Sequence, residues 1–168
     1  MLFYIFLSAV IIQRLAELII SKRNEIWLKS RGAVEYGREH YKYIVIMHIL
    51  FFVSMSTEYI LNGSHDELNI FNYMFLVFFI ILQVMRIWVI SSLGKYWNTR
   101  IYRVHGDKLV KSGLYKYLKH PNYIIVCCEI LSLPLIFNLF YTAVVFSVLN
   151  AIILSVRIRT ENKILNYN

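Results

Sequence analysis

Two polar clusters in this sequence combine residue types and spacings that suit ligand binding. In the first, His120 and Tyr123 flank Pro121 at a predicted helix start. Proline is favourable there, and the free backbone N–H groups of a helix start attract a carboxylate. In the second, Arg157 and Glu161 are four residues apart, so they share one face of a helix and can pair with each other or hold two charges of a ligand. Together these clusters predict a pocket for a zwitterionic cofactor.

Other chemistries lack their characteristic motifs. The sequence has no Gly-x-Ser-x-Gly, no Walker loop, no Gly-x-Gly-x-x-Gly and no metal-ligand spacing. Cys127 and Cys128 are adjacent, so a disulfide between them would close no useful loop, and we interpret them as packing residues. The net charge of +8 would indicate nucleic acid in a soluble protein. Here the charges lie beside apolar segments, so we expect anionic lipid headgroups as partners and no nucleic acid.

The composition predicts the class of protein that must position these clusters. Of the 168 residues, 58% are hydrophobic and only 17% are charged. The mean hydropathy is +0.54. These values are typical of an all-α polytopic integral membrane protein, here a single domain over residues 1–168.

Apolar runs of membrane-spanning length predict five transmembrane helices. The last apolar run is too long for one helix and is interrupted by Pro134, so we expect a helical hairpin that turns near Asn138. The predicted spans are residues 2–20, 43–61, 70–92, 122–137 and 140–156.

Positive charges predict the orientation of these spans. The connections after the first and third spans and the C-terminal tail are basic, whereas the turn at residues 62–67 is acidic. An outside N-terminus places every basic segment in the cytoplasm. The abundance of Ile, Lys, Asn and Tyr indicates an AT-rich bacterial genome, so we expect the bacterial plasma membrane.

Several polar residues lie within the predicted spans or beside them. Arg14 and Glu17 form either an internal ion pair that faces another helix or part of the site. Arg86 either snorkels or faces the interior, and Glu129 either faces the cofactor cavity or bonds a neighbouring helix. We expect three residues of the long connection to lie over the pocket: Trp97, Asn98 and Arg100.

The C-terminal half resembles the isoprenylcysteine carboxyl methyltransferase family, which are integral membrane enzymes. The matching motifs, in order, are Leu109-Val110, Gly113-x-Tyr115, His120-Pro121-Asn122-Tyr123 and Arg157-x-x-x-Glu161-Asn162-x-x-Leu165. The N-terminal half, with Asn24-Glu25-x-Trp27, is similar to the short bacterial branch of that family. Lys119 and Asn162 stand where the family pattern has Arg and a second Glu, so the acceptor need not be a prenylated protein.

This resemblance implies an S-adenosylmethionine-dependent methyltransferase with a cofactor region over residues 93–165. Arg157 would bind the methyl acceptor, and Arg157, Glu161 and His120 would be catalytic, with His120 or Glu161 as the base for a hydroxyl acceptor. The implied cofactor-binding residues are Asp107, Lys108, Leu109, Val110, Tyr115, His120, Pro121, Asn122, Tyr123 and Glu161.

Less specific interpretations of these residues stay open. His120 would merely cap the helix, the tyrosines would anchor the membrane interface, and Arg157 and Arg159 would be ordinary positive-inside residues. For the chain as a whole we expect O-methylation of a lipophilic small molecule or lipid, such as an alkylated polyketide pyrone. The alternatives are a phospholipid N-methyltransferase, an NADPH-dependent sterol-type reductase and a non-enzymatic membrane protein.

Overall fold

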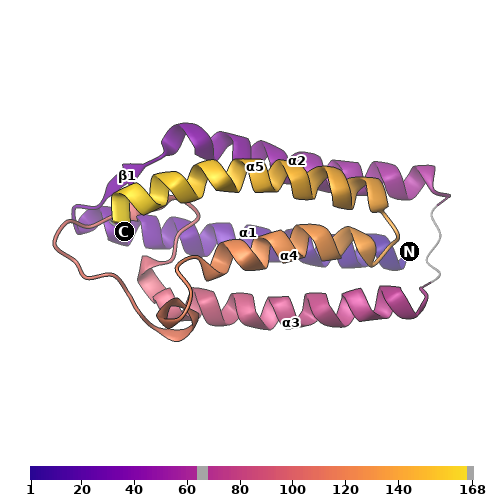
Figure 1. Cartoon of the computed structure of the whole chain (residues 1–168), viewed down its shortest axis with the longest axis horizontal. Coiled ribbons are helices and arrows are strands. Elements are labelled where there is room, and N and C mark those ends of the chain that lie inside the picture. Colours follow the sequence, from indigo (N-terminus) through magenta and orange to yellow (C-terminus); the bar gives the residue numbers. More distant parts are fainter. Residues whose placement is uncertain (64–67, 166–168) are drawn as a thin grey trace.

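Five helices run lengthwise beside one another in a bundle (Figure 1). The computed structural model describes residues 1–63 and 68–165. The helices are α1 (Leu2–Ser30), α2 (Arg38–Leu61), α3 (Ile70–Leu93), α4 (Pro121–Leu135) and α5 (Phe140–Leu165). The all-α prediction is confirmed, apart from a short two-stranded sheet.

Four of the helices are long and apolar enough to cross a membrane: α1, α2, α3 and α5. The fifth, α4, has 15 residues, or about 22 Å of helix, against a hydrocarbon core of about 30 Å. The structure therefore supports four spans by length, and the predicted count of five is not confirmed.

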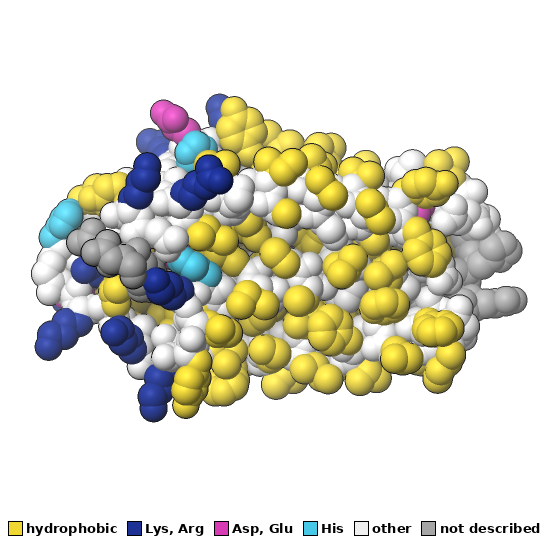
Figure 2. All heavy atoms as spheres, viewed as in Figure 1, with side chains coloured by type: hydrophobic (Ala, Val, Ile, Leu, Met, Phe, Trp, Pro, Cys, Tyr) yellow, Lys and Arg dark blue, Asp and Glu magenta, His cyan; other side chains and the backbone are white. Residues whose placement is uncertain are grey.

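Charged and apolar side chains occupy different parts of the surface (Figure 2). Apolar side chains cover the visible face along the helices, as expected for lipid contact. Lys and Arg side chains gather at one end, where Figure 1 places β1 and the C-terminus. The predicted grouping of the basic segments at one end of the molecule is thus visible. The acidic part of the turn at residues 62–67 falls mainly on residues 64–67, which lie outside the described residues.

The first and last helices extend beyond their predicted spans. Helix α1 continues through the expected polar loop to Ser30, and α5 continues to Leu165. In α1 the extension is stabilised because Glu25 pairs with Lys22 at 3.2 Å and with Lys29 at 2.5 Å. These extra turns project the polar residues of α1 towards the connection that follows α3.

The predicted hairpin is present as α4 and α5. Pro121 occupies the first turn of α4, and Asn138 adopts a left-handed conformation (φ 57°) in the turn between the helices. Pro134 lies inside the last turn of α4 instead of breaking the run earlier. The turn is fastened to α3 because Asn72 Nδ2 donates to Leu135 O at 3.1 Å and to Asn138 Oδ1 at 2.9 Å.

A two-stranded antiparallel sheet joins the two long polar connections. Strand β1 (Val34–Tyr36) pairs with β2 (Ile101–Arg103) so that Glu35 lies opposite Tyr102. Two short 3₁₀ helices, η1 (Gly94–Tyr96) and η2 (Gly113–Lys116), complete the connection after α3. The sheet holds the two connections together over the basic end of the bundle.

Candidate functional site

Two cavities meet inside the basic end of the bundle. The first, here called the polar cavity, has a volume of about 140 Å³ and lies among the connection after α3, the start of α4 and the end of α5. The second, the apolar cavity, has a volume of about 410 Å³ and lies mainly among α1, α2, α4 and α5. Four residues line both cavities and are here called the shared wall: Trp97, Asn122, Tyr123 and Arg157.

The residues singled out in the sequence come together around the polar cavity. Its lining includes Arg157 and all the implied cofactor residues except Pro121, which is buried at the start of α4. Trp97, Asn98 and Arg100 line it as well, as expected for a connection that lies over the pocket. The lining residues from the implied set are Asp107, Lys108, Leu109, Val110, Tyr115, His120, Asn122, Tyr123, Arg157 and Glu161.

A chain of hydrogen bonds links α4 and α5 at the shared wall. Arg157 Nε donates to Tyr123 Oη at 2.7 Å, and Tyr123 Oη donates to Glu161 Oε2. Arg157 Nη2 also donates to the carbonyl oxygen of Thr99 at 2.6 Å, which ties α5 to the connection after α3. The side chain of Arg157 is buried, with 9% of the residue exposed. It is therefore more than a surface positive charge.

The side chain of His120 faces α5 and does not cap α4. No cap hydrogen bond from it is found among the described residues. Its Nε2 lies 2.8 Å from Asn162 Oδ1, and its Nδ1 lies 3.6 Å from Glu161 Oε2. The ring also stacks on Tyr123, with centroids 5.4 Å apart. Because the amide oxygen of Asn162 only accepts, Nε2 is the donor in this contact. The simple capping interpretation of His120 is wrong.

Gly113 explains how the Gly-x-Tyr motif places Tyr115 at the cavity. Its φ is +54°, and an added Cβ would lie 2.1 Å from Ser92 Oγ and 2.9 Å from Ser92 Cβ on α3. Only glycine allows η2 to approach α3 this closely. The motif is thus a packing requirement that fixes one side of the polar cavity.

The acidic residue Asp107 is held from two sides. Its carboxylate accepts from Arg31 Nη2 at 3.2 Å and from Tyr96 Oη at 2.7 Å. Arg31 follows the end of α1, so the N-terminal half contributes to the cavity indirectly.

Tyr102 lines the polar cavity from β2 and interacts with the opposite strand. Its hydroxyl donates to Glu35 Oε2 at 3.2 Å, and Arg100 Nη1 donates to Glu35 Oε1 at 3.0 Å. Burial, and then the charge of Glu35, raise the pKa of Tyr102 above its usual value. The phenol therefore stays protonated and remains a donor at neutral pH.

Thr99 and Ser21 tie the connection after α3 to α1, a contact that the sequence did not predict. Ser21 Oγ lies 2.9 Å from Thr99 Oγ1 and accepts from Thr99 N at 3.1 Å. Asn98 Nδ2 donates to the carbonyl oxygen of Ser21 at 2.9 Å. No local motif marks these residues, because the contact joins positions 77 or 78 apart in the chain.

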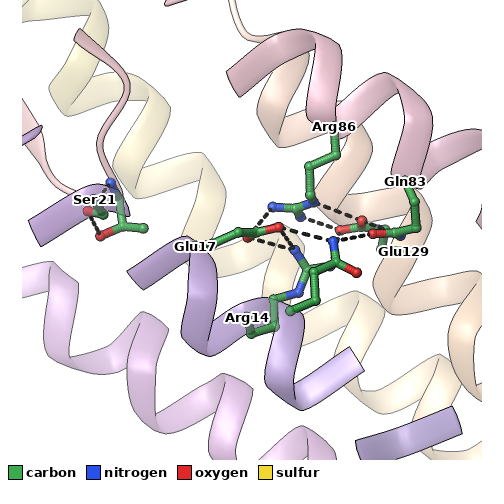
Figure 3. Close-up of polar contacts among 8 residues, drawn as sticks. Arg14, Glu17, Ser21, Gln83, Arg86 and Glu129 are labelled. Atoms are coloured by element: carbon green, nitrogen blue, oxygen red, sulfur yellow. Dashed lines mark hydrogen bonds and ion pairs between the residues drawn. The ribbon is translucent and has the colours of Figure 1, made fainter. Parts of the chain in front are cut away.

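Four charged residues form a buried network within the bundle (Figure 3). Arg86 Nε donates to Glu129 Oε1 at 2.9 Å, and Arg86 Nη1 donates to Glu17 Oε2 at 3.1 Å. Arg14 pairs with Glu17 and Glu129, both at 2.9 Å. The expected Arg14–Glu17 ion pair that faces another helix is confirmed. Arg86 faces the interior of the bundle, and Glu129 pairs with Arg14 of α1 and Arg86 of α3. All four residues also line the apolar cavity.

The two cysteines, Cys127 and Cys128, are free thiols. Within residues 1–63 and 68–165, no group of three His, Cys, Asp or Glu side chains is placed to hold a metal ion.

Comparisons with known proteins place the chain in a family. The model of the isoprenylcysteine carboxyl methyltransferase (ICMT) family matches residues 75–167. An "Uncharacterized protein YpbQ" of Bacillus subtilis (strain 168) is 43% identical over 166 residues, which cover 98% of this chain and 96% of that protein. An "Uncharacterized protein" of Haemophilus influenzae is 30% identical over 155 residues, 92% of this chain and 89% of that protein. No solved structure matches. With its apolar helices and this match, the chain is an integral membrane protein that belongs to the isoprenylcysteine carboxyl methyltransferase family.

Proposed function

We propose that this protein is an S-adenosylmethionine-dependent O-methyltransferase that acts on a lipophilic acceptor at the membrane. The observation that carries the proposal is the shared wall, where a polar cavity with a charged lining meets an apolar cavity inside the bundle. At such a junction a polar and an apolar substrate can meet. Family membership supports methyl transfer as the reaction.

The lining of the polar cavity fits a zwitterionic cofactor. Glu161 and Asp107 supply carboxylates for an ammonium group, and Glu161 Oε1 accepts no hydrogen bond from a described residue. Lys108 and the backbone N–H groups at the start of α4 supply positive charge and donors for a carboxylate. Tyr115 and His120 add aromatic surface.

The residues of the shared wall would position the acceptor for in-line transfer. When bound, S-adenosylmethionine would supply an activated methyl group: its carbon–sulfur bond would break with the electron pair left on sulfur while the acceptor oxygen forms the new bond. Arg157 keeps N–H donors beyond its bonds to Tyr123 and Thr99, and these would hold the acceptor oxygen. With a hydroxyl acceptor, the proton would pass to Glu161 or His120. A carboxylate acceptor needs no base.

The apolar cavity would hold the hydrocarbon part of the acceptor. Leu15 and Leu18 of α1 and Val45 and Ile49 of α2 line this cavity and are also exposed on the bundle surface. The cavity therefore reaches the lipid-facing side, which suits a molecule that arrives from the bilayer. Within this class we favour an alkylated pyrone or phenol that carries a hydroxyl group.

The polar cavity would face the cytoplasm of a bacterial cell, with the N-terminus outside. In support, the basic side chains gather at the same end of the bundle as the polar cavity (Figure 2).

The decisive test is transfer of labelled methyl from S-adenosylmethionine into a lipid extract of the host, followed by identification of the product. We expect an O-methylated lipid. Methylated phosphatidylethanolamine would overturn O-methylation in favour of phospholipid N-methylation. Stabilisation of the purified protein by NADPH and not by S-adenosylmethionine would overturn methyl transfer itself.

Two variants test whether the polar cavity binds the cofactor. We expect His120→Ala and Glu161→Ala to weaken S-adenosylmethionine binding about tenfold or more, since each removes a polar group of the lining. The matched controls His105→Ala and Glu39→Ala remove exposed residues and should leave binding unchanged. Unaltered binding in both cavity variants would indicate that the cofactor lies elsewhere or that the protein is not an enzyme.

A further inference from the structure

We propose that Trp97 and Asn122 bind the reacting polar group of the methyl acceptor and determine which acceptors are used. The inference rests on the proposed function. Both residues belong to the shared wall, so each faces the polar and the apolar cavity. Neither belongs to the chain of hydrogen bonds formed by Arg157, Tyr123 and Glu161.

Both side chains bury a polar atom that no described residue satisfies. Trp97 is 3% exposed, and its Nε1 finds no acceptor among residues 1–63 and 68–165. Asn122 Oδ1 likewise finds no donor within the same residues. A buried indole N–H usually has a hydrogen-bond partner, because leaving it unpaired is costly. A buried donor and a buried acceptor on one cavity wall therefore point to a ligand that pairs with both.

The backbone holds Trp97 firmly in this position. The backbone N–H of Trp97 donates to the carbonyl oxygen of Gly94 at 3.1 Å, and the backbone carbonyl oxygen of Trp97 accepts from Asn24 Nδ2 of α1 at 2.7 Å. The side-chain amide of the next residue, Asn98, donates a hydrogen bond to the carbonyl oxygen of Ser21. Asn122 follows Pro121 in the rigid first turn of α4. The backbone at both residues is thus held in place, by contacts with α1 at Trp97 and by the first turn of α4 at Asn122.

The chemistry of the pair favours a hydroxyl-bearing acceptor. Indole Nε1 only donates, and the Oδ1 atom of Asn122 only accepts. A hydroxyl group can satisfy both before it reacts, because its oxygen accepts from Trp97 while its O–H donates to Asn122. For methyl transfer the O–H would then turn from Asn122 to Glu161 or His120, which takes the proton. A carboxylate offers acceptors alone, so it can pair with Trp97 Nε1 but not with Asn122 Oδ1 in the amide orientation that the structure has. In this orientation the pair would therefore favour a phenol over a fatty acid of the same length.

Substitutions that remove one hydrogen-bonding atom test the pair in lipid nanodiscs. The probes are a long-chain 3-alkylphenol, whose hydroxyl group stays protonated at neutral pH, and a fatty acid of matched length, with labelled S-adenosylmethionine. We expect Trp97→Phe to lower kcat/KM for the phenol about tenfold, mainly through KM, without changing cofactor affinity. Asn122→Asp keeps an acceptor and should retain phenol methylation, whereas Asn122→Ala should lose it. Trp88→Phe, at a lipid-exposed position of α3, is the control and should have no effect.

A second readout detects acceptor binding without catalysis. The chain has three tryptophans, so ¹⁵N-labelled protein gives three indole N–H signals, and that of Trp97 is the one absent in Trp97→Phe. Adding the alkylphenol should shift this signal and leave that of Trp88 in place.

The two readouts separate this inference from the proposed function. A shifted Trp97 signal without methyl transfer would support the binding pair and overturn the proposed reaction on this acceptor. Methyl transfer with an unmoved Trp97 signal and an unaffected Trp97→Phe variant would overturn the pair and leave the reaction standing. If neither transfer nor a shift occurs, both are overturned.

Discussion

Among the side chains of the polar cavity, Arg157 has a hydrogen-bonding geometry that no other residue type reproduces. Its planar guanidinium donates in two directions, to Tyr123 Oη and to the carbonyl oxygen of Thr99. Lysine keeps the charge but offers a single ammonium group that cannot reproduce this fork.

We therefore expect Arg157→Lys to reduce methyl transfer about tenfold or more, with a smaller effect on cofactor affinity. Steady-state rates with labelled S-adenosylmethionine would measure this. Arg159→Lys is the matched control, because Arg159 is exposed on the same helix two residues away. Equal rates for the two variants would show that Arg157 serves only as a positive charge.

Part of the site could be predicted residue by residue. Arg157 and Glu161 are four residues apart on one helix, so the sequence alone shows that they are neighbours. The same holds for His120 and Tyr123, which lie at one helix start. It could not show that Tyr123 lies between Arg157 and Glu161, because this contact joins α4 to α5.

At the level of the elements, Gly113 decides how closely η2 packs against α3. We expect Gly113→Ala to weaken cofactor binding about tenfold and to lower the melting temperature, since its Cβ would lie 2.1 Å from Ser92 Oγ. Isothermal titration with S-adenosylmethionine and thermal unfolding in detergent would measure both effects.

The control for this substitution is Gly106→Ala. Gly106 also has a positive φ, +88°, but nothing lies within 4 Å of an added Cβ. Both variants carry left-handed backbone strain of about 1–2 kcal/mol, and only Gly113→Ala adds the clash. If the two variants behave alike, the close approach of η2 to α3 is not what positions Tyr115.

A network of four charged residues, Arg14, Glu17, Arg86 and Glu129, joins α1, α3 and α4. Each of these residues pairs with one of opposite charge. We expect Glu129→Leu to lower the free energy of unfolding by about 3–5 kcal/mol, because it leaves Arg86, which is 5% exposed, short of a carboxylate. Thermal unfolding in detergent would detect the loss. The control Glu39→Leu removes an exposed carboxylate and should have little effect.

The double variant Arg86→Met/Glu129→Leu should recover much of that loss, since Arg14 and Glu17 still pair with each other. A double variant less stable than Glu129→Leu alone would mean that the charges themselves, and not their pairing, hold the helices.

For the molecule as a whole, the distribution of basic residues predicts the orientation in the membrane. In a background with Cys127 and Cys128 replaced by alanine, we expect Asn62→Cys to react with a membrane-impermeant maleimide in intact cells. His105→Cys, at the basic end, should react only after permeabilisation. The reverse labelling would place the polar cavity outside.

From its residues alone, the sequence predicts the apolar surface, the helical class and the hairpin, because these follow from apolar length, turn chemistry at Pro121 and Asn138, and spacing within one helix. The remaining residues of the polar cavity, such as Asp107 and Tyr115, were predicted by the family resemblance. The length of α1 beyond its apolar run was missed, because polar residues such as Glu25 sustain a helix when they pair along it.

The sequence did not show which distant segments meet, whereas the tertiary structure does. It joined Ser21 to Thr99, strand β1 to β2, and Glu17 to Arg86, pairs separated by about 65 to 78 residues. It also showed that the polar and apolar cavities share Trp97, Asn122, Tyr123 and Arg157. Such contacts depend on how whole helices pack, and hydrophobic packing carries no short sequence motif, because many apolar residues of suitable size satisfy it.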